Sequence, residues 1–166
     1  AIKSMPLWPQ EFDFIIRGYA SPKYKEYLET LVENLGLTHR VQLADPVPFG
    51  ELIEVASEAD IGYFVHKDLS PQKRFVLPNK FFEYIQAGLA LCVSDLPSMA
   101  EIVKQHSLGV LVGDYTEEAI ATAINSLTKD KIREFKQASI DAREELCWEN
   151  ESQKLISYYD SIMTSR

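Results

Sequence analysis

Short apolar runs alternate with longer segments of helical periodicity along most of the chain. The runs have the length and composition of buried strands, and they cover residues 12–16, 41–43, 61–65, 89–94 and 109–112. Apolar residues at three- and four-residue spacing predict helices over residues 24–35, 49–58, 77–88, 97–105 and 116–127. Residues 66–78 contain two prolines and no periodicity, which predicts a loop.

This alternation predicts an α/β fold, a Rossmann-like parallel sheet with helices on both faces. The length of 166 residues suits a single domain over 1–166. We expect 131–166 to be a helical tail of that domain, packed through Tyr158, Tyr159 and Ile162. Such sheets bind ligands beyond the carboxyl ends of their strands, so the loops after the strands are where a site is expected.

Charge and cysteine content narrow the classes of function. The formal net charge of −8 opposes binding to nucleic acid and to anionic lipid, since both are polyanions. Cys92 lies in an apolar run, which favours a buried thiol over a disulfide. The chain has no apolar run of about 20 residues and no secretory signal at its start, so we predict a cytoplasmic protein. Its three histidines lack the spacing of metal ligands, and no metal site is predicted.

The stretch LPNKFFEYIQAG, residues 77–88, carries the most informative chemistry. We expect Pro78 in the first turn of a helix that Gly88 ends. The free N–H groups of that turn, with Asn79 and Lys80, would suit a phosphate. Glu83 lies about one turn further along, where its carboxylate could accept from both hydroxyls of a ribose. An ordinary Lys80–Glu83 ion pair on a solvated face is the alternative, and the spacing leaves both interpretations open.

Several stretches, in this order, resemble the carboxyl-terminal half of B-type retaining glycosyltransferases of family 4. They are FIIRG, LGLTHRVQLADPVP, EVASEADIGYFV, LPNKFFEYIQAG with LALCVSDLPSMAEIV, and GVLVGDYTEEAIATAI, and they cover about residues 12–127. The resemblance implies the donor nucleotide-sugar-binding domain of a two-domain enzyme. That parent enzyme would move a sugar from a UDP- or GDP-sugar to a glycan or lipid-linked acceptor, without metal or other cofactor.

The resemblance also assigns roles to residues. It implies that Glu83 binds the donor ribose, that the start of its helix faces the diphosphate, and that the segment after the second strand lies by the base. Arg17 follows a strand end, where a phosphate contact and a solvated side chain are both open interpretations. The expected donor-binding residues are Arg17, Pro46, Val47, Pro78, Asn79, Lys80 and Glu83, with Asp45 beside them.

The chain departs from the family pattern in two places. Many members carry an earlier glutamate eight positions before the one that matches Glu83, and Phe75 stands there, so we assign no catalytic residue. The first strand of the half, its Gly-rich turn and its basic pair do not precede Phe12, and the acceptor-binding half is missing too. We therefore expect a fragment that is inactive alone. Strands 12–16 and 61–65 would then pair directly, or another chain, such as a second copy, would fill the gap.

Two alternatives remain beside the glycosyltransferase interpretation. One is a nucleotide-sugar epimerase of similar build, and the other is a non-catalytic nucleotide-binding or interaction module of the same fold. Besides the nucleotide sugar, we expect two partners: the missing amino-terminal acceptor domain and, for the parent enzyme, a peripheral membrane contact. Titration with nucleotides and their sugars separates these hypotheses.

Overall fold

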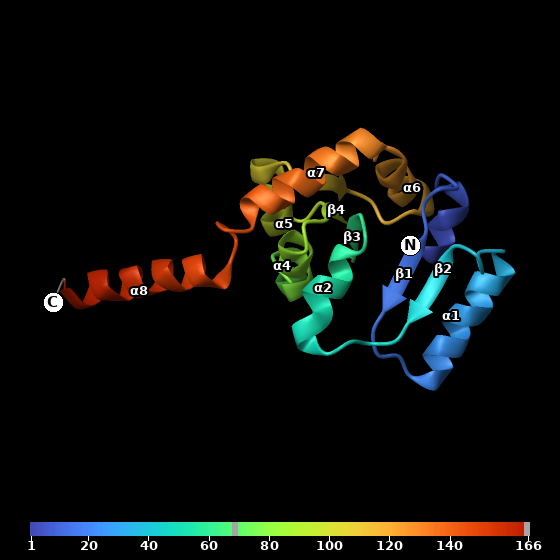
Figure 1. Ribbon diagram of the computed structural model, residues 1–166, viewed down its shortest axis with the longest axis horizontal. Helices are drawn as coiled ribbons and strands as arrows, with labels where there is room; N and C mark the ends of the chain where they lie inside the picture. Colours follow the sequence, from blue (N-terminus) through green and yellow to red (C-terminus); the bar gives the residue numbers. More distant parts are fainter. Residues whose placement is uncertain (68–69, 165–166) are drawn as a thin grey trace.

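The computed structural model describes residues 1–67 and 70–164 (Figure 1). Its strands are β1 Phe14–Arg17, β2 Val41–Ala44, β3 Ile61–Phe64, β4 Ala90–Ser94 and β5 Gly109–Val112. Its α-helices are α1 Pro22–Asn34, α2 Leu52–Ser57, α3 Pro71–Arg74, α4 Asn79–Gln86, α5 Pro97–His106, α6 Glu117–Asn125, α7 Lys129–Ala142 and α8 Trp148–Thr164. Two 3-10 turns, η1 Ile2–Leu7 and η2 Phe49–Glu51, complete the order. The predicted α/β alternation is confirmed, but the predicted loop 66–78 contains the short helix α3. Residues 68 and 69 of this loop lie outside the described part.

All strand pairs are parallel, and the strands form two sheets rather than one. β1 pairs with β2, and β3, β4 and β5 pair in that order. Within the described residues β1 and β3 do not pair, so the expectation that these strands pair directly is wrong. The sheet is therefore divided between β1 and β3, where the order 3-2-1-4-5-6 places a further strand.

Two apolar clusters cover opposite faces of the sheets. The first gathers η1, α1 and α6 over one face, against Phe14 and Ile16 of β1, Tyr63 of β3 and Cys92 of β4. The second gathers α4 and α5 over the other face, against Phe64 and Leu91. All five residues of β4 are buried because helices cover both its faces. Cys92 is a fully buried free thiol, as predicted.

Aromatic side chains join the two sheets on the first face. The ring of Phe14 on β1 meets the ring of Tyr63 on β3 edge to face, with centroids 5.5 Å apart. Trp8 contacts both rings, at 5.7 Å and 6.4 Å, and its indole N–H donates to Ser4 Oγ. Figure 1 accordingly shows β1 and β3 side by side. Arg40 donates from Nη2 to the carbonyls of residues 9 and 12, which fixes the entry to β1.

Helix α4 is held close against β3. Phe81 and Ile85 are fully buried on its inner face. At Gly62 of β3 a Cβ would come within 2.5 Å of the Tyr84 ring, so only glycine permits this approach. Gly88 follows the helix with φ +71°, a left-handed conformation that glycine adopts without strain, and the predicted helix stop is confirmed.

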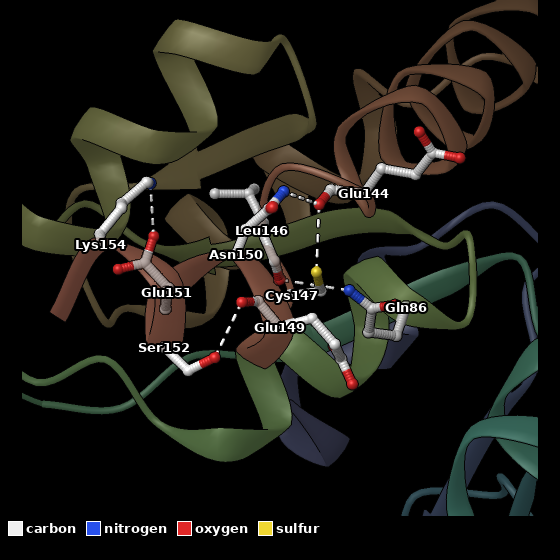
Figure 2. A network of polar contacts seen from close by, with 9 residues as sticks. All are labelled: Gln86, Glu144, Leu146, Cys147, Glu149, Asn150, Glu151, Ser152 and Lys154. Atoms are coloured by element: carbon white, nitrogen blue, oxygen red, sulfur yellow. Dashed lines mark hydrogen bonds and ion pairs between the residues drawn. The ribbon is translucent and has the colours of Figure 1, made fainter. Parts of the chain in front are cut away.

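The far end of α4 is tied to the segment that joins α7 to α8 (Figure 2). Gln86 donates from Nε2 to the carbonyl oxygens of Arg143 at 3.0 Å and Leu146 at 3.2 Å. Beyond this junction, Asn150 Nδ2 and Cys147 Sγ both donate to the Glu144 carbonyl oxygen, which starts α8. These contacts hold the start of α8 and not its later turns.

The two tail helices behave differently. α7 packs on the body through the buried Ser139 and Ala142, whereas α8 has no buried residue and extends away from the rest of the chain (Figure 1). The expectation that Tyr158, Tyr159 and Ile162 pack is therefore wrong, since all three are exposed. No neighbouring element of the described chain reaches that side of α8. In the described residues no helix has the length and apolar character needed to cross a membrane.

Candidate functional site

The carboxyl ends of β1 and β2 bring three of the predicted residues together. Arg17 at the end of β1 donates from Nη1 to the Asp45 carbonyl oxygen at 2.7 Å. This bond holds the guanidinium beside Pro46 and Val47, which follow directly and are half-buried. Arginine has five N–H donors, so most of the guanidinium remains available at this edge.

The start of α4 offers backbone donors. Pro78 precedes the helix in an extended conformation, so the expectation that it occupies the first turn is wrong by one position. The first intrahelical bond runs from the Phe81 N–H to the Pro78 carbonyl oxygen, which leaves the N–H groups of Asn79 and Lys80 without helical partners. Both of these side chains are exposed. The helix end is therefore positively polarised and accessible, as an anion requires.

Glu83 lies half-buried one turn into α4. Within the described residues the four ion pairs involve other side chains, and neither Lys80 nor Glu83 belongs to one. The interpretation of these two residues as an ordinary ion pair is therefore not what the structure has. Burial, and after it the negative charge of Glu83, raises the pKa of the adjacent Tyr84 hydroxyl. The carboxylate thus stands in a partly desolvated position with its acceptor sites unused by described residues.

The loop that leads from β3 to α4 is anchored by two serines. Ser94, fully buried at the end of β4, accepts from the His66 N–H at 2.8 Å and donates to the His66 carbonyl oxygen at 3.0 Å. Ser98 at the start of α5 donates to the Phe75 carbonyl oxygen at 3.2 Å. These anchors were not foreseen from the sequence, because a serine at a strand or helix end has no distinctive spacing.

Phe75 stands where the family pattern would place the first glutamate. Its side chain is 62% exposed, so the phenyl ring is not retained there by packing. Residue 75 therefore has no carboxylate to take the role of that glutamate, and we assign no catalytic residue. Among residues 1–67 and 70–164 no group of three or more His, Cys, Asp or Glu side chains is placed to hold a metal ion.

An open pocket lies at the start of α5, beside the carboxyl ends of β4 and β5. It has a volume of about 590 Å³ and is lined by Arg74, Asp95, Leu96, Pro97, Ala100, Glu101, Lys104, Gly113 and Tyr115. Lys104 pairs with Asp95 at 3.8 Å, and both side chains are largely exposed. None of the seven predicted site residues lines this pocket. The structure thus brings Arg17 together with 45–47, and it places Asn79, Lys80 and Glu83 together on α4 with Pro78 just before the helix.

Several solved structures share the fold of this chain. A sucrose-phosphate synthase from Thermosynechococcus elongatus shares 18% identity with a TM-score of 0.78, over 99% of this chain and 42% of that one. Anabaena HepE in complex with UDP-glucose shares 15% with a TM-score of 0.72, over 99% and 44%. WaaG, a glycosyltransferase involved in lipopolysaccharide biosynthesis, shares 15% with a TM-score of 0.67, over 86% and 38%. At 15–18% identity, this structural likeness shows a common fold and nothing more.

The chain spans 38–44% of the length of the solved chains it matches. No curated protein matches it by sequence. The sequence profile of one family, described as "Glycosyl transferases group 1", matches residues 1–145, which is most of the chain. The expected Rossmann-like fold and the expected family are thereby confirmed, and the chain belongs to the group 1 glycosyl transferases.

Proposed function

We propose that this chain is the donor nucleotide-sugar-binding domain of a glycosyltransferase. The parent enzyme would transfer a sugar from a UDP- or GDP-sugar to a glycan or a lipid-linked acceptor, with retention of configuration and without a metal ion. The proposal rests on two neighbouring features of α4. The N–H groups at its start have no helical partner, and Glu83, one turn along, is half-buried and belongs to no ion pair of the described residues. The fold shared with HepE, whose structure contains UDP-glucose, supports it.

In this proposal the donor lies across the start of α4. Its diphosphate accepts from the N–H groups of Asn79 and Lys80, with the Lys80 ammonium nearby, and its ribose hydroxyls donate to Glu83. Arg17 stands at the neighbouring strand end, where Pro46 and Val47 flank the base. Positive charge on the leaving diphosphate is the main contribution that a protein makes to such a transfer. Since the described site residues that carry positive charge are few, Lys80 and Arg17 among them, we expect this chain to be inactive alone.

The test is calorimetric titration of the chain with UDP, GDP, UDP-glucose and a GDP-hexose. Glu83→Ala should weaken the preferred ligand at least about 100-fold, because two hydrogen bonds to a carboxylate contribute roughly 1.5–3 kcal/mol each and 1.4 kcal/mol is a factor of ten. Glu83→Gln keeps the shape and should weaken binding about tenfold or more. Glu29→Gln, an exposed glutamate on α1, is the matched control and should change nothing.

If the Glu83 variants bound nucleotides as tightly as the unchanged chain, Glu83 could not be the residue that binds the donor ribose. Failure of every nucleotide and nucleotide sugar to bind would favour the non-catalytic interaction module. One observation gives that second candidate some support: the exposed Phe75 replaces an acidic residue with an apolar one at the edge of the proposed site. The cytoplasmic location, the acceptor-binding partner domain and the membrane contact of the parent enzyme stay predictions.

A further inference from the structure

His66, two residues beyond the end of β3, is held in a fixed position. The Ser94 hydroxyl, fully buried at the end of β4, accepts from the His66 N–H at 2.8 Å and donates to the His66 carbonyl oxygen at 3.0 Å. The imidazole meets the ring of Phe64 edge to face, with centroids 5.0 Å apart. Backbone and ring are therefore both fixed, although none of the donor contacts proposed above uses this side chain.

The two ring nitrogens of His66 differ in their hydrogen bonding. Nδ1 lies 3.2 Å from the Lys67 carbonyl oxygen, and since a carbonyl oxygen only accepts, Nδ1 carries the hydrogen of this bond. Of the buried side-chain nitrogen and oxygen atoms that the structure describes, Nε2 is the one without a partner. When the single hydrogen of the neutral ring is on Nδ1, Nε2 has a free lone pair. A buried acceptor without a partner calls for an explanation, and a donor group on a ligand provides one.

His66 lies on the face of the sheet that α4 covers. Successive side chains of an extended chain alternate between the two faces, so His66 shares a face with Phe64, and the contact between their rings agrees with this. Phe64 packs in the second apolar cluster, together with Phe81 and Phe82 of α4. The imidazole therefore stands on the side of α4 and not on the side of α1 and α6.

The imidazole is also level with the start of α4. The helix runs opposite to the strands, because it ends shortly before β4 begins and β4 is parallel to β3. Tyr84 lies over Gly62. Four residues earlier, or about 6 Å along the helix, Lys80 is level with Phe64, since two strand residues span about the same length. His66 lies two residues further still, beside the space into which the free N–H groups of the first turn point.

A donor bound as proposed above brings different chemical groups to this space. Its ribose hydroxyls bond to Glu83, and the diphosphate of a nucleotide sugar is fully ionised at neutral pH, so its oxygens cannot donate to Nε2. The base lies by Pro46 and Val47 after β2, and β1 stands between that position and β3 (Figure 1). The sugar that follows the diphosphate is therefore the part of the donor whose hydroxyl groups His66 can accept from.

We propose that His66 determines specificity for the sugar of the donor, because its Nε2 accepts a hydrogen bond from a hydroxyl of the sugar that is transferred. This inference rests on the proposed function, and it distinguishes the complete nucleotide sugar from the free nucleotide. A ligand without that hydroxyl leaves the buried acceptor unpaired, so it gains nothing from His66. The residue positions the substrate and needs no change of its own charge.

Calorimetric titration measures what His66 contributes to each part of the donor. His66→Phe keeps a ring against Phe64 but removes the acceptor, so it should weaken binding of the nucleotide sugar roughly tenfold and leave that of free UDP or GDP within about twofold. His66→Gln puts an amide oxygen near the position of Nε2 and should recover part of the loss. His39→Phe, at an exposed histidine before β2, is the matched control and should change neither affinity.

Nucleotide sugars that each lack one hydroxyl identify the partner of Nε2. For the unchanged chain, one of these deoxy analogues should bind roughly tenfold more weakly than the parent nucleotide sugar, because Nε2 stays unpaired. For His66→Phe the same analogue should bind as the parent does. This double comparison isolates the one hydrogen bond, since a general loosening of the site would weaken all analogues alike.

Nuclear magnetic resonance of isotope-labelled histidine gives a direct measure of the same contact. The Nε2 resonance of His66, assigned through its loss in His66→Phe, should shift when the nucleotide sugar is added and stay in place with the free nucleotide. His39 and His106 precede β2 and β5, at the opposite edge of the sheet, and their resonances should not move. A purely structural role of His66 would not produce this difference between the two ligands.

The outcomes separate this inference from the proposed function. If no nucleotide and no nucleotide sugar binds, the proposed function fails and the role of His66 fails with it. If both ligands bind through Glu83 but His66→Phe weakens neither, or both equally, the proposed function stands and the role of His66 is overturned. An Nε2 resonance that shifts with the free nucleotide also overturns it. If His66→Phe does not fold, the deoxy analogues and the resonance of the unchanged chain, assigned with His66→Gln, still decide.

Discussion

Replacing Gly62 by alanine tests how closely α4 must approach the sheet. A Cβ at this position would lie 2.5 Å from Tyr84 Cγ and Cδ2 and 2.7 Å from Tyr84 Cβ. Ordinary contacts begin near 3.4 Å, so the helix and the strand have to separate by about 0.9 Å. The helix cannot move freely, because Phe81 and Ile85 on its inner face are fully buried and Gln86 is bonded to the α7–α8 segment.

Insertion of one methyl group into a packed interface of this kind costs about 1–3 kcal/mol. We therefore expect Gly62→Ala to lower the free energy of unfolding by that amount, measured by urea denaturation followed by circular dichroism. The slope of the free energy against urea should not change, since the same surface is exposed on unfolding. The melting temperature should fall by roughly 2–4 °C per kcal/mol for a chain of this size.

Two variants sharpen this test. At Gly50 a Cβ would meet nothing within 4 Å, so Gly50→Ala is the matched control and should stay within about 0.5 kcal/mol of the unchanged chain. Tyr84→Ala removes the ring but keeps the Cβ that lies 2.7 Å away, so in a double-mutant cycle it should recover only part of the loss. A Gly62→Ala protein as stable as Gly50→Ala, or complete recovery by Tyr84→Ala, would refute the reasoning.

Further predictions concern buried polar groups. Ser139→Ala removes a fully buried bond of 2.7 Å to the Leu89 carbonyl oxygen and should cost about 1–3 kcal/mol in urea denaturation. Burial raises the pKa of the Cys92 thiol from 9.0 to about 12. The unfolded chain therefore loses this proton first, and the free energy of unfolding should fall between pH 9 and 12 by up to about 1.4 kcal/mol per pH unit. Cys92→Ala should reduce this dependence on pH. Burial also raises the pKa of Tyr63, which acts in the same direction above pH 10. In mass-spectrometric alkylation at pH 8 the half-exposed Cys147 should react well before Cys92, and equal rates would contradict this burial.

Sequence patterns predicted the elements whose signals are local. The positions of the five strands follow from apolar runs, and the helix predicted from residue 116 begins there because Thr116 accepts the Ala119 N–H. Gly88 ends α4 because its left-handed conformation is a property of that one residue. These features depend on a few neighbouring side chains, which the sequence displays directly.

Features that depend on contacts between distant residues could not be predicted from local sequence patterns. α3 forms in the expected loop with Ser70 as its cap, within a loop that Ser98 ties to the start of α5. The apolar side of α8 has the periodicity of a packed helix, but its exposure depends on whether another surface lies within reach. The strand ends and the helix start that hold the expected donor-site residues follow from local patterns, but their binding to a nucleotide depends on a ligand and stays a prediction.

The two tryptophans occupy opposite environments, and this gives the molecule a pair of built-in optical reporters. Trp8 is 5% exposed and wedged between the rings of β1 and β3, whereas Trp148 at the root of α8 is 72% exposed. Emission from the first should be blue-shifted and shielded from iodide, and emission from the second red-shifted and readily quenched. Structural changes between β1 and β3 and structural changes along α8 can therefore be followed in one fluorescence spectrum, without attaching a dye.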